Sequence, residues 1–347
     1  MKHADALIIG GGVIGLSLAC ELRRRGMSVI VLERHQPGRE ASWAAGGMIA
    51  YSEAGPHPQF RELARVSAEM YPEFVHRLQD ESGVNVDFRS EGKIHFLEEG
   101  KAVPEGGTRL SEAELRQLEP QVEFSGEALL LQESTVDPRA LMEALVKGAL
   151  HLGVEIDSGA DVAGLELDGN RVSGAITTKT RYTGQQVVIC AGAWSSSLFD
   201  LRIRPVKGHM LEVIPQRPLR HVIHGNGVYI VPRSDGRHVI GSTIEDAGFD
   251  KRVNPDVIQR LHQAAAMLVP NLGEGLIHQS WTGLRPCSAD KLPVLGATSL
   301  EGLFAATGHY RDGIMLAPIT ARVLAGTMSG EVPSFDITAF LPNRFAN

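Results

Sequence analysis

The sequence predicts an α/β protein, α+β overall, in which a parallel sheet with flanking helices is joined to a second, mainly antiparallel β-sheet domain. Three observations predict this fold class. The N-terminal stretch reads as strand, glycine-rich turn, helix and strand. Residues from Gly208 to about Gly275 alternate short strands with one helix. With 347 residues and 43% hydrophobic content, the chain is long enough for two domains with a sizeable core.

The first element is the short apolar run from Ala6 to Ile9, which is typical of a parallel strand buried on both faces. A glycine-rich turn, Gly10 to Gly15, follows at once. The next segment has an apolar helical face and ends at Gly26, a common helix stop. Residues 28–32 then read as a second strand, which closes with Glu33.

This order of elements indicates a Rossmann-like dinucleotide site. Gly10 permits the tight turn, Gly12 lets the backbone approach a pyrophosphate, and Gly15 allows close packing of helix on strand. The helix N-terminus presents unpaired amides to the phosphates. Glu33 is placed to accept a ribose hydroxyl and would repel a ribose phosphate, which disfavours NADP. NAD and FAD both remain open on these residues alone.

The later elements follow from periodicity and capping. A helical stripe predicts a helix over residues 58–82, and residues 84–97 look strand-like with Gly92 at a turn. Asp137 and Pro138 form a helix start, and that helix ends at Gly153. Strands are expected at 164–167, 172–178, 186–190 and 303–306, and helices at 255–268 and 313–328.

These elements predict two interleaved domains. The cofactor domain is expected to comprise residues 1–83, 139–207 and 276–347. The substrate domain is expected to comprise residues 84–138 and 208–275. We see no internal repeat and no low-complexity segment in the sequence.

Composition narrows the class of protein. Lys plus Arg total 34 against 41 Asp plus Glu, so the formal charge of −7 disfavours a nucleic-acid partner. The three cysteines have no metal-ligand spacing and no pairing scheme, which suits a reducing cytoplasm. No apolar stretch predicts membrane insertion, and the N-terminus reads directly into a strand without a cleavable signal. Homo-oligomerisation is left open.

The segment from Arg34 to Met48 is rich in small residues and has neither helix nor strand periodicity. It could be a flexible surface loop, or it could lay backbone amides along a large flat ligand. The segment resembles the FAD-binding loop of the D-amino acid oxidase-like FAD-dependent oxidoreductases. Further similar motifs are VVICAGAWS at 187–195, YIVPRSDGRHVIGST at 229–243, WTGLRP at 281–286 and GHYRDGIMLAP at 308–318. Within that family, GSTIEDAGFD at 241–250 and GHYRDGI resemble the glycine oxidases of thiamine biosynthesis.

The resemblance runs from Ala6 to about Pro318 and implies FAD as the cofactor. The residues expected to contact it come from the glycine-rich turn, the loop, one later strand and the last helix start: Gly10, Gly12, Val13, Ile14, Gly15, Glu33, Arg34, Ala41, Ser42, Gly46, Gly47, Met48, Val162, His309, Tyr310, Asp312, Gly313, Ile314 and Met315. Met48 could instead be an ordinary core residue. The helix that starts near Gly313 is expected to direct its positive end at the flavin.

The resemblance also implies three residues that contact the substrate. Arg311 matches the arginine that pairs with the substrate carboxylate, for which a bidentate guanidinium is well suited. The alternative is a surface arginine paired with Asp312. Tyr229 matches a tyrosine whose hydroxyl contacts the same carboxylate, or it is a half-buried strand residue. Arg285 matches an arginine on the substrate side of the pocket, with a structural ion pair as the alternative.

Other reactive side chains are expected to be structural. His209 and His309 are tempting bases, but a substrate amine can lose its proton to solvent. The histidines are scattered, and no metal site is suggested. Some relatives attach flavin to a cysteine near Cys287. However, the residues that follow it, Ser288 to Pro293, resemble the non-covalent relatives, so non-covalent FAD is expected.

The function that the resemblance implies is oxidation of glycine or a small D-amino or N-methyl amino acid. The product would be a 2-oxo acid, and molecular oxygen would be reduced to hydrogen peroxide. Alternatives are a D-amino acid dehydrogenase with a quinone acceptor, a flavin-dependent tRNA-modification module and a non-catalytic flavin-binding subunit. A quinone-linked dehydrogenase would be expected to bind membranes, but this sequence has no basic amphipathic anchor. A tRNA-modification module would need a basic run, which this sequence lacks. A non-catalytic subunit would have no need of Tyr229 and Arg311 together.

Overall fold

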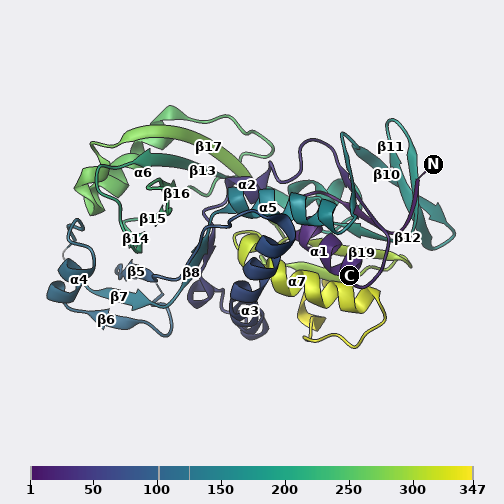
Figure 1. Cartoon of the computed structure of the whole chain (residues 1–347), viewed down its shortest axis with the longest axis horizontal. Coiled ribbons are helices and arrows are strands. Elements are labelled where there is room, and N and C mark those ends of the chain that lie inside the picture. The colour runs from purple at the N-terminus through teal and green to yellow at the C-terminus, as the bar shows by residue number, and fades with distance from the viewer. Residues whose placement is uncertain (1, 101, 125, 346–347) are drawn as a thin grey trace.

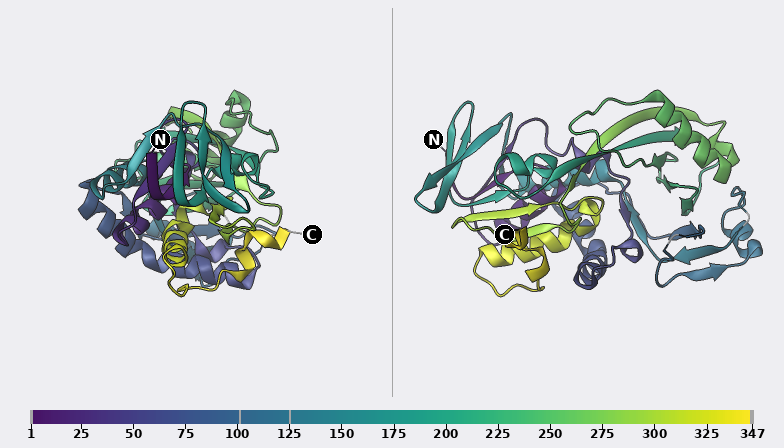
Figure 2. Two further views of the ribbon diagram at one scale, coloured as in Figure 1. Left: turned by 90° about the vertical axis from the view of Figure 1, so that its right-hand side faces the viewer. Right: turned by 180° about the vertical axis from the view of Figure 1, so that it is seen from behind.

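The computed structural model describes residues 2–100, 102–124 and 126–345. Its strands form two eight-stranded sheets and one three-stranded sheet. Figure 1 shows an elongated molecule with one large sheet at each end and most of the helices beside the first sheet. The right-hand view of Figure 2 shows the same two ends of the molecule from behind. The predicted α/β fold class, with a Rossmann-like part and a second mainly antiparallel sheet, is confirmed.

The first sheet has a parallel centre. Strands β9, β2, β1, β12 and β19 pair in parallel, while β10, β11 and β18 add antiparallel pairs. Their bounds are β1 Lys2–Ile9, β2 Val29–Glu33, β9 Glu155–Ser158, β10 Val162–Asp168, β11 Arg171–Thr177, β12 Arg181–Ile189, β18 Val294–Ala297 and β19 Leu303–Thr307. The parallel order places the carboxyl ends of β1 and β2 beside the glycine-rich turn.

Strand β1 is buried on both faces, as its apolar run predicts. Ala6 and Ile8 pack in one cluster with the helices, whereas Leu7 and Ile9 pack in another cluster on the opposite face. This alternation is the period of two expected for a strand. The two cores together fix the sheet that holds the glycine-rich turn.

The helices begin and end at recognisable signals. Their bounds are α1 Val13–Arg24, α2 Ala41–Ala44, α3 Pro58–Ser82, α4 Glu112–Leu118, α5 Pro138–His151, α6 Pro255–Leu268 and α7 Gly313–Met328, with 3₁₀ turns η1 Tyr51–Glu53, η2 Gly192–Ser197, η3 Pro270–Leu272, η4 Thr338–Phe340 and η5 Pro342–Phe345. Helices α3 and α6 have the predicted bounds. The Asp137 carboxylate accepts the Arg139 amide at 2.8 Å, which confirms the predicted cap of α5. Within the described ranges, we find no helix with the length and apolar character needed to cross a membrane.

The second sheet has the order β17-β13-β16-β15-β14-β5-β7-β6, and all its pairs are antiparallel except β14 with β5. Its strands are β5 Lys93–Phe96, β6 Thr108–Leu110, β7 Ala128–Leu131, β13 Arg204–Ile214, β14 Val222–Gly225, β15 Val228–Pro232, β16 His238–Gly241 and β17 Leu276–Cys287. Strand β17 pairs with β13 along its length, beyond the expected domain boundary at residue 276. The division into domains remains a prediction.

A small third sheet is formed by three short strands from separate parts of the sequence. It contains β3 Met48–Ile49, β8 Ser134–Val136 and β4 Phe88–Arg89. The segment from Arg34 to Met48, which has no periodicity in the sequence, contains the single turn α2 and reaches β3. Elements this short are set by tertiary contacts, so periodicity does not reveal them.

Candidate active site

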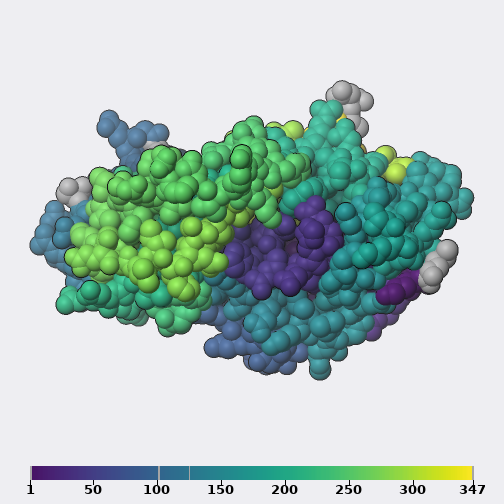
Figure 3. All heavy atoms as spheres, turned by 90° about the horizontal axis from the view of Figure 1, so that it is seen from above, coloured from purple at the N-terminus to yellow at the C-terminus, as the bar shows by residue number. Residues whose placement is uncertain are grey.

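A cavity of about 1100 Å³ runs between the two large sheets. It is lined by the glycine-rich turn, the loop that contains α2, strands β13, β15 and β17, and the turn before α7. Figure 3 shows the surface hollowed where the N-terminal segment, in purple, lies between the green and teal parts of the chain. A volume of this size exceeds the usual range for a drug-sized ligand, ~300–1,000 Å³, and suits a dinucleotide together with a small substrate.

One end of the cavity is made mostly of backbone. Helix α1 begins after Gly12 without a side-chain cap, and the Val13 amide donates to Ser42 Oγ at 3.0 Å. A Cβ atom at Gly12 would meet only Ser42 Oγ within 4 Å, at 3.2 Å, so its approach from the cavity is open. Gly10 has a φ of +113°, and a Cβ there would lie 2.4 Å from the Cys190 carbonyl oxygen. We call this region the phosphate end.

The neighbouring residues add an acid and an aromatic platform. The Glu33 carboxylate, at the end of β2, accepts the Gly11 amide at 2.8 Å and the His35 amide at 2.9 Å. The Arg34 guanidinium lies 3.8 Å from the centre of the Trp194 ring. These side chains line the cavity, so its wall offers a carboxylate and a cation–π pair beside the N-terminus of α1. The residues present fit a dinucleotide such as FAD.

The other end of the cavity, the substrate end, is made of side chains from distant segments. Between β19 and α7 the chain turns sharply, with φ of +74° at Gly308 and +51° at Tyr310. A positive φ is uncommon for a bulky residue and is tolerated where surrounding contacts enforce it. The Tyr310 amide donates to the Pro286 carbonyl at 2.8 Å, which ties this turn to β17. The turn thereby brings Arg311 to the cavity beside the strand that carries Arg285.

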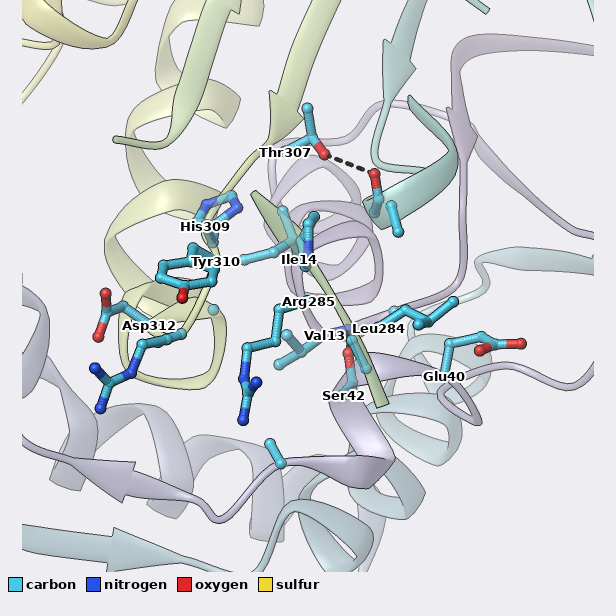
Figure 4. A pocket seen from close by; sticks show the side chains of 18 of the residues that line it. Val13, Ile14, Glu40, Ser42, Leu284, Arg285, Thr307, His309, Tyr310 and Asp312 are labelled. Atoms are coloured by element: carbon cyan, nitrogen blue, oxygen red, sulfur yellow. Dashed lines mark hydrogen bonds between the residues drawn. The ribbon is translucent and has the colours of Figure 1, made fainter. Parts of the chain in front are cut away.

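Arg285 and Arg311 have no ion pair with any carboxylate in the described part of the chain. Arg285 instead donates to the Ser242 hydroxyl at 2.8 Å and to the Thr243 carbonyl at 2.9 Å. Its guanidinium reaches into the space between Tyr310 and Ser42 (Figure 4). Arg285 is therefore held in place by neutral acceptors, and its positive charge is not neutralised. The expected alternatives, a structural ion pair for Arg285 and an Arg311–Asp312 pair, are not seen among the described residues.

Tyr229 is buried in β15 and lines the cavity. Its hydroxyl donates to Met210 Sδ at 3.3 Å, a weak acceptor that a stronger one could replace. Two glycines leave room for the ring, because a Cβ at Gly46 would lie 2.9 Å from a ring carbon and one at Gly241 would lie 2.6 Å from the hydroxyl oxygen. Gly208 does the same for Arg285, whose guanidinium nitrogens would lie 2.4 Å from a Cβ there.

Two titratable groups on the turn before α7 have displaced pKa values. Burial lowers the pKa of His309 to about 3, so its ring is neutral, and its Nε2 atom lies 3.1 Å from Thr320 Oγ1. Loss of solvent raises the pKa of the Asp312 carboxyl to about 6, although the positive charge of Arg311 opposes this rise. His209 lies outside the cavity lining and contacts Glu245 Oε1 through Nδ1 at 2.8 Å. Both histidines have structural partners.

The cavity brings together most of the residues expected from the sequence. Tyr229, Arg285, Arg311 and the expected cofactor residues all line it, apart from Gly15 and Met315. A Cβ at Gly15 would lie 2.0 Å from the Gly10 carbonyl oxygen, so Gly15 serves the close packing of α1 on β1. Met315 is buried in the core, and its carbonyl accepts the Ser67 hydroxyl at 2.7 Å. Their proposed contact with cofactor remains a prediction.

Several lining residues were not found from the sequence. Glu53, Trp194, Ser242 and Gly208 all line the cavity. Trp194 and Ser242 lie in two of the motifs that resemble the family, so they could have been predicted as lining residues from those motifs. Glu53 and Gly208 carry no local signal, because their roles depend on partners far along the chain.

Cys287 ends β17 and does not line the cavity. Its side chain is buried, its Sγ atom lies 3.4 Å from the Ser288 carbonyl oxygen, and burial raises the pKa of its thiol. A buried neutral thiol is a poor nucleophile.

Comparisons with known proteins agree with this geometry. A family model described as FAD dependent oxidoreductase matches residues 5–327. The chain is 37% identical over 340 residues to a bifunctional ThiO/ThiG protein of Trichormus variabilis, covering 92% of this chain and 52% of that one. It is therefore similar to about half of that relative's length. It is 34% identical over 373 residues to a glycine oxidase of Pseudomonas aeruginosa, covering 97% and 98% of the two chains. The crystal structure of glycine oxidase from Geobacillus kaustophilus superposes with a TM-score of 0.93 at 29% identity, covering 100% of both chains.

Proposed function

Because the chain belongs to the FAD-dependent oxidoreductase family, we propose that it oxidises glycine and small relatives of glycine, such as sarcosine and small D-amino acids. One observation carries this proposal. A single cavity joins a helix N-terminus that has glycine as its N-cap to two guanidiniums, Arg285 and Arg311, that have no ion pair among the described residues. The first feature suits the phosphates of FAD, and the second suits the carboxylate of an amino acid.

When bound, FAD would take the hydride from the α-carbon of the substrate and pass the electrons to oxygen, which gives hydrogen peroxide and an imine that hydrolyses to the 2-oxo acid. Arg311 binds the carboxylate through its planar fork, and Tyr229 donates its hydroxyl to the same group. Arg285, held by Ser242 and Thr243, adds a second positive charge. These contacts fix the α-carbon in one place, which is the main contribution that a protein makes to this chemistry.

The remaining residues hold the cofactor and shape its surroundings. Gly12 presents its backbone at the start of α1, Glu33 and Arg34 line the neighbouring wall, and the N-terminus of α7 adds positive potential at the substrate end. Two further expectations are part of this proposal. Resemblance to the glycine oxidases of thiamine biosynthesis supports a role in that pathway. The three free cysteines, Cys20, Cys190 and Cys287, support a reducing, cytoplasmic location.

The direct test is anaerobic mixing of the purified protein with glycine, sarcosine, D-alanine and their L-counterparts where these exist. We expect at least one of the first three to bleach the flavin absorbance. Admitting oxygen should then restore the absorbance and yield one hydrogen peroxide per turnover. Bleaching that only a quinone reverses would instead identify a dehydrogenase. Failure of every amino acid to bleach the flavin would contradict the proposal.

We expect FAD to be bound without a covalent bond. Acid precipitation should release the flavin into the supernatant, because the Cys287 thiol is buried and lies outside the cavity lining. Flavin that stays with the pellet in the parental protein, but not in Cys287→Ser, would show a covalent attachment.

A further inference from the structure

A second charged group of residues adjoins the substrate end of the cavity. Glu53, the last residue of η1, lines the cavity. Its Oε1 atom lies 2.7 Å from Lys93 Nζ, 2.9 Å from His224 Nδ1 and 3.1 Å from His95 Nδ1. Three nitrogen atoms from strands β5 and β14 therefore converge on one carboxylate oxygen. We call these four residues the Glu53 cluster.

Within the Glu53 cluster, the single lysine contacts a second carboxylate as well as Glu53. The Lys93 side chain is 2% exposed and also lies 2.7 Å from Glu133 Oε2. Glu133 is fixed in turn by the amide and hydroxyl of Ser52, at 3.0 and 2.5 Å. One lysine thus serves two carboxylates, Glu53 and Glu133, so its single positive charge does not cancel both.

Glu53 is ionised, and it lines the same cavity as Arg311. Burial would raise the pKa of its carboxyl, but His224, His95 and the charge of Lys93 hold that pKa well below its usual range. The charge of Glu53 also contributes to the raised pKa of Asp312, the neighbour of Arg311. His224 packs edge-on against Tyr229, with ring centres 6.4 Å apart. The cluster therefore lies beside the residues proposed to bind the carboxylate.

This arrangement complements the charges of an amino acid. The two guanidiniums, which have no ion pair among the described residues, suit a carboxylate, and a fixed carboxylate lining the same cavity suits an amino group. A metal ion is a competing occupant, since the ligand atoms of Glu53, His95 and His224 lie within 4.8 Å of one another. However, the Lys93 ammonium already contacts Glu53 Oε1 and would repel a divalent cation placed there.

We propose that Glu53 binds the amino group of the substrate, so that the cavity selects amino acids over carboxylic acids that lack an amino group. The inference rests on the proposed function, because it requires an amino acid at the substrate end. Glu53 touches the substrate directly. Lys93, His95 and His224 are positioning residues, because they hold the Glu53 carboxylate in place and in its charged form.

The test compares a ligand that has the amino group with one that lacks it. For the parental protein and Glu53→Gln, kcat/KM is measured with glycine, and the inhibition constant is measured with acetate as competitor. Glu53→Gln should lower kcat/KM for glycine by about ten- to a hundredfold, because a neutral amide oxygen replaces the charged acceptor of the amino group. The acetate inhibition constant should stay the same or fall, because acetate has no amino group to lose and is no longer repelled.

A matched control is available in Glu119. Its Oε1 atom also accepts three groups, the amides of Arg220 and His221 at 2.7 and 2.6 Å and His221 Nδ1 at 2.9 Å, but it does not line the cavity. Glu119→Gln should therefore change kcat/KM for glycine and the inhibition constant for acetate by equal factors, if it changes them at all. If Glu53→Gln also changes them equally, Glu53 is structural and the inference is wrong.

Two further measurements keep the test decisive. Should Glu53→Gln fail to fold, Glu53→Asp keeps the charge on a shorter side chain and should still weaken glycine more than acetate. Equal weakening in that variant would also overturn the inference. The parental protein is measured first: if it oxidises no amino acid, the proposed function fails, whereas parental activity with no selective effect at Glu53 refutes this inference alone.

Discussion

The two ends of the cavity are built in different ways. The phosphate end comes mainly from one continuous stretch, in which β1, the glycine-rich turn, α1 and β2 follow one another, and it consists mostly of backbone with the Glu33 carboxylate beside it. The substrate end is assembled from η1, β15, β17 and the turn before α7, and its groups are charged or polar side chains. One end is therefore a local motif, and the other exists only once the chain has folded.

Glycine shows the same contrast. At the phosphate end, Gly10 and Gly15 let backbone approach backbone, since a Cβ at either would lie within 2.4 Å of a carbonyl oxygen. At the substrate end, Gly208 and Gly241 leave room for the side chains of Arg285 and Tyr229. The first kind can be recognised from spacing, whereas the second depends on which side chain lies opposite. We therefore expect variants at the two ends to fail in separable ways.

The largest effect is expected at the phosphate end, from Gly12→Asp. The new carboxylate would occupy the open approach at the start of α1 and repel the pyrophosphate, so the protein should lose essentially all of its FAD. The flavin-to-protein absorbance ratio measures this loss. Gly164→Asp is a matched control, because a Cβ at Gly164 meets nothing within 4 Å and the residue does not line the cavity. Full flavin content in Gly12→Asp would contradict the assignment of this end.

The next largest effect is expected at the substrate end, from Arg311→Ala. Arg311 is exposed at the mouth of the cavity, so its removal should cost about what a hydrogen bond to a charged group contributes, ~1.5–3 kcal/mol, and kcat/KM should fall by about ten- to a hundredfold. FAD should stay bound, because the phosphate end is untouched. Arg311→Lys should recover only part of the activity, since an ammonium cannot reproduce the bidentate fork. Steady-state kinetics with glycine, sarcosine and D-alanine provide the comparison. A near-parental kcat/KM in Arg311→Ala would show that Arg311 is not the main residue that binds the carboxylate.

A pH effect is expected from Asp312, whose pKa is raised from 3.8 to about 6 by burial. The folded protein therefore keeps this proton at a pH where the unfolded chain has released it. Stability from the neutral carboxyl is full below about pH 4 and is lost as the pH rises through about 6. At about pH 8 the charged carboxylate should cost the folded state about 1–3 kcal/mol.

Asp312→Asn cannot ionise and should therefore be more stable than the parent at about pH 8, with the difference fading toward about pH 4. Urea unfolding at saturating FAD measures the free energy of unfolding of both proteins. A difference that grows as the pH falls would show that the carboxyl is stabilised in its charged form instead.

The smallest effect is expected from Tyr229→Phe. It removes one hydrogen bond to the substrate, worth ~0.5–1.5 kcal/mol, so kcat/KM should fall by about two- to tenfold. The fold should hardly change, because among the described residues the hydroxyl donates only to the Met210 sulfur. A loss in Tyr229→Phe as large as that in Arg311→Ala would mean that the tyrosine, and not the arginine, is the main anchor.

The same contrast explains what could be predicted from the sequence. The phosphate end was predicted because its glycines and Glu33 stand at fixed spacings in one short segment. Helices α3 and α6 were predicted with the right bounds because apolar periodicity and proline starts mark them. Arg285, Arg311 and Tyr229 were placed only through motifs that resemble a known family.

Glu53 was missed for a physical reason. Its partners His95 and His224 lie 42 and 171 residues away in the sequence, and two strands of different parts of the chain must pair before they meet. Neither periodicity nor spacing reports such a contact. Helix α2 was missed as well, because a four-residue helix carries no periodic signal.

The most direct test of a two-ended cavity is a crystal structure of the protein with FAD and acetate. Our account predicts the pyrophosphate against the Gly12 backbone at the start of α1, and the acetate carboxylate on Arg311 and Tyr229 at the other end. Acetate bound away from both residues, or Arg311 turned onto Asp312 with FAD in place, would contradict the account.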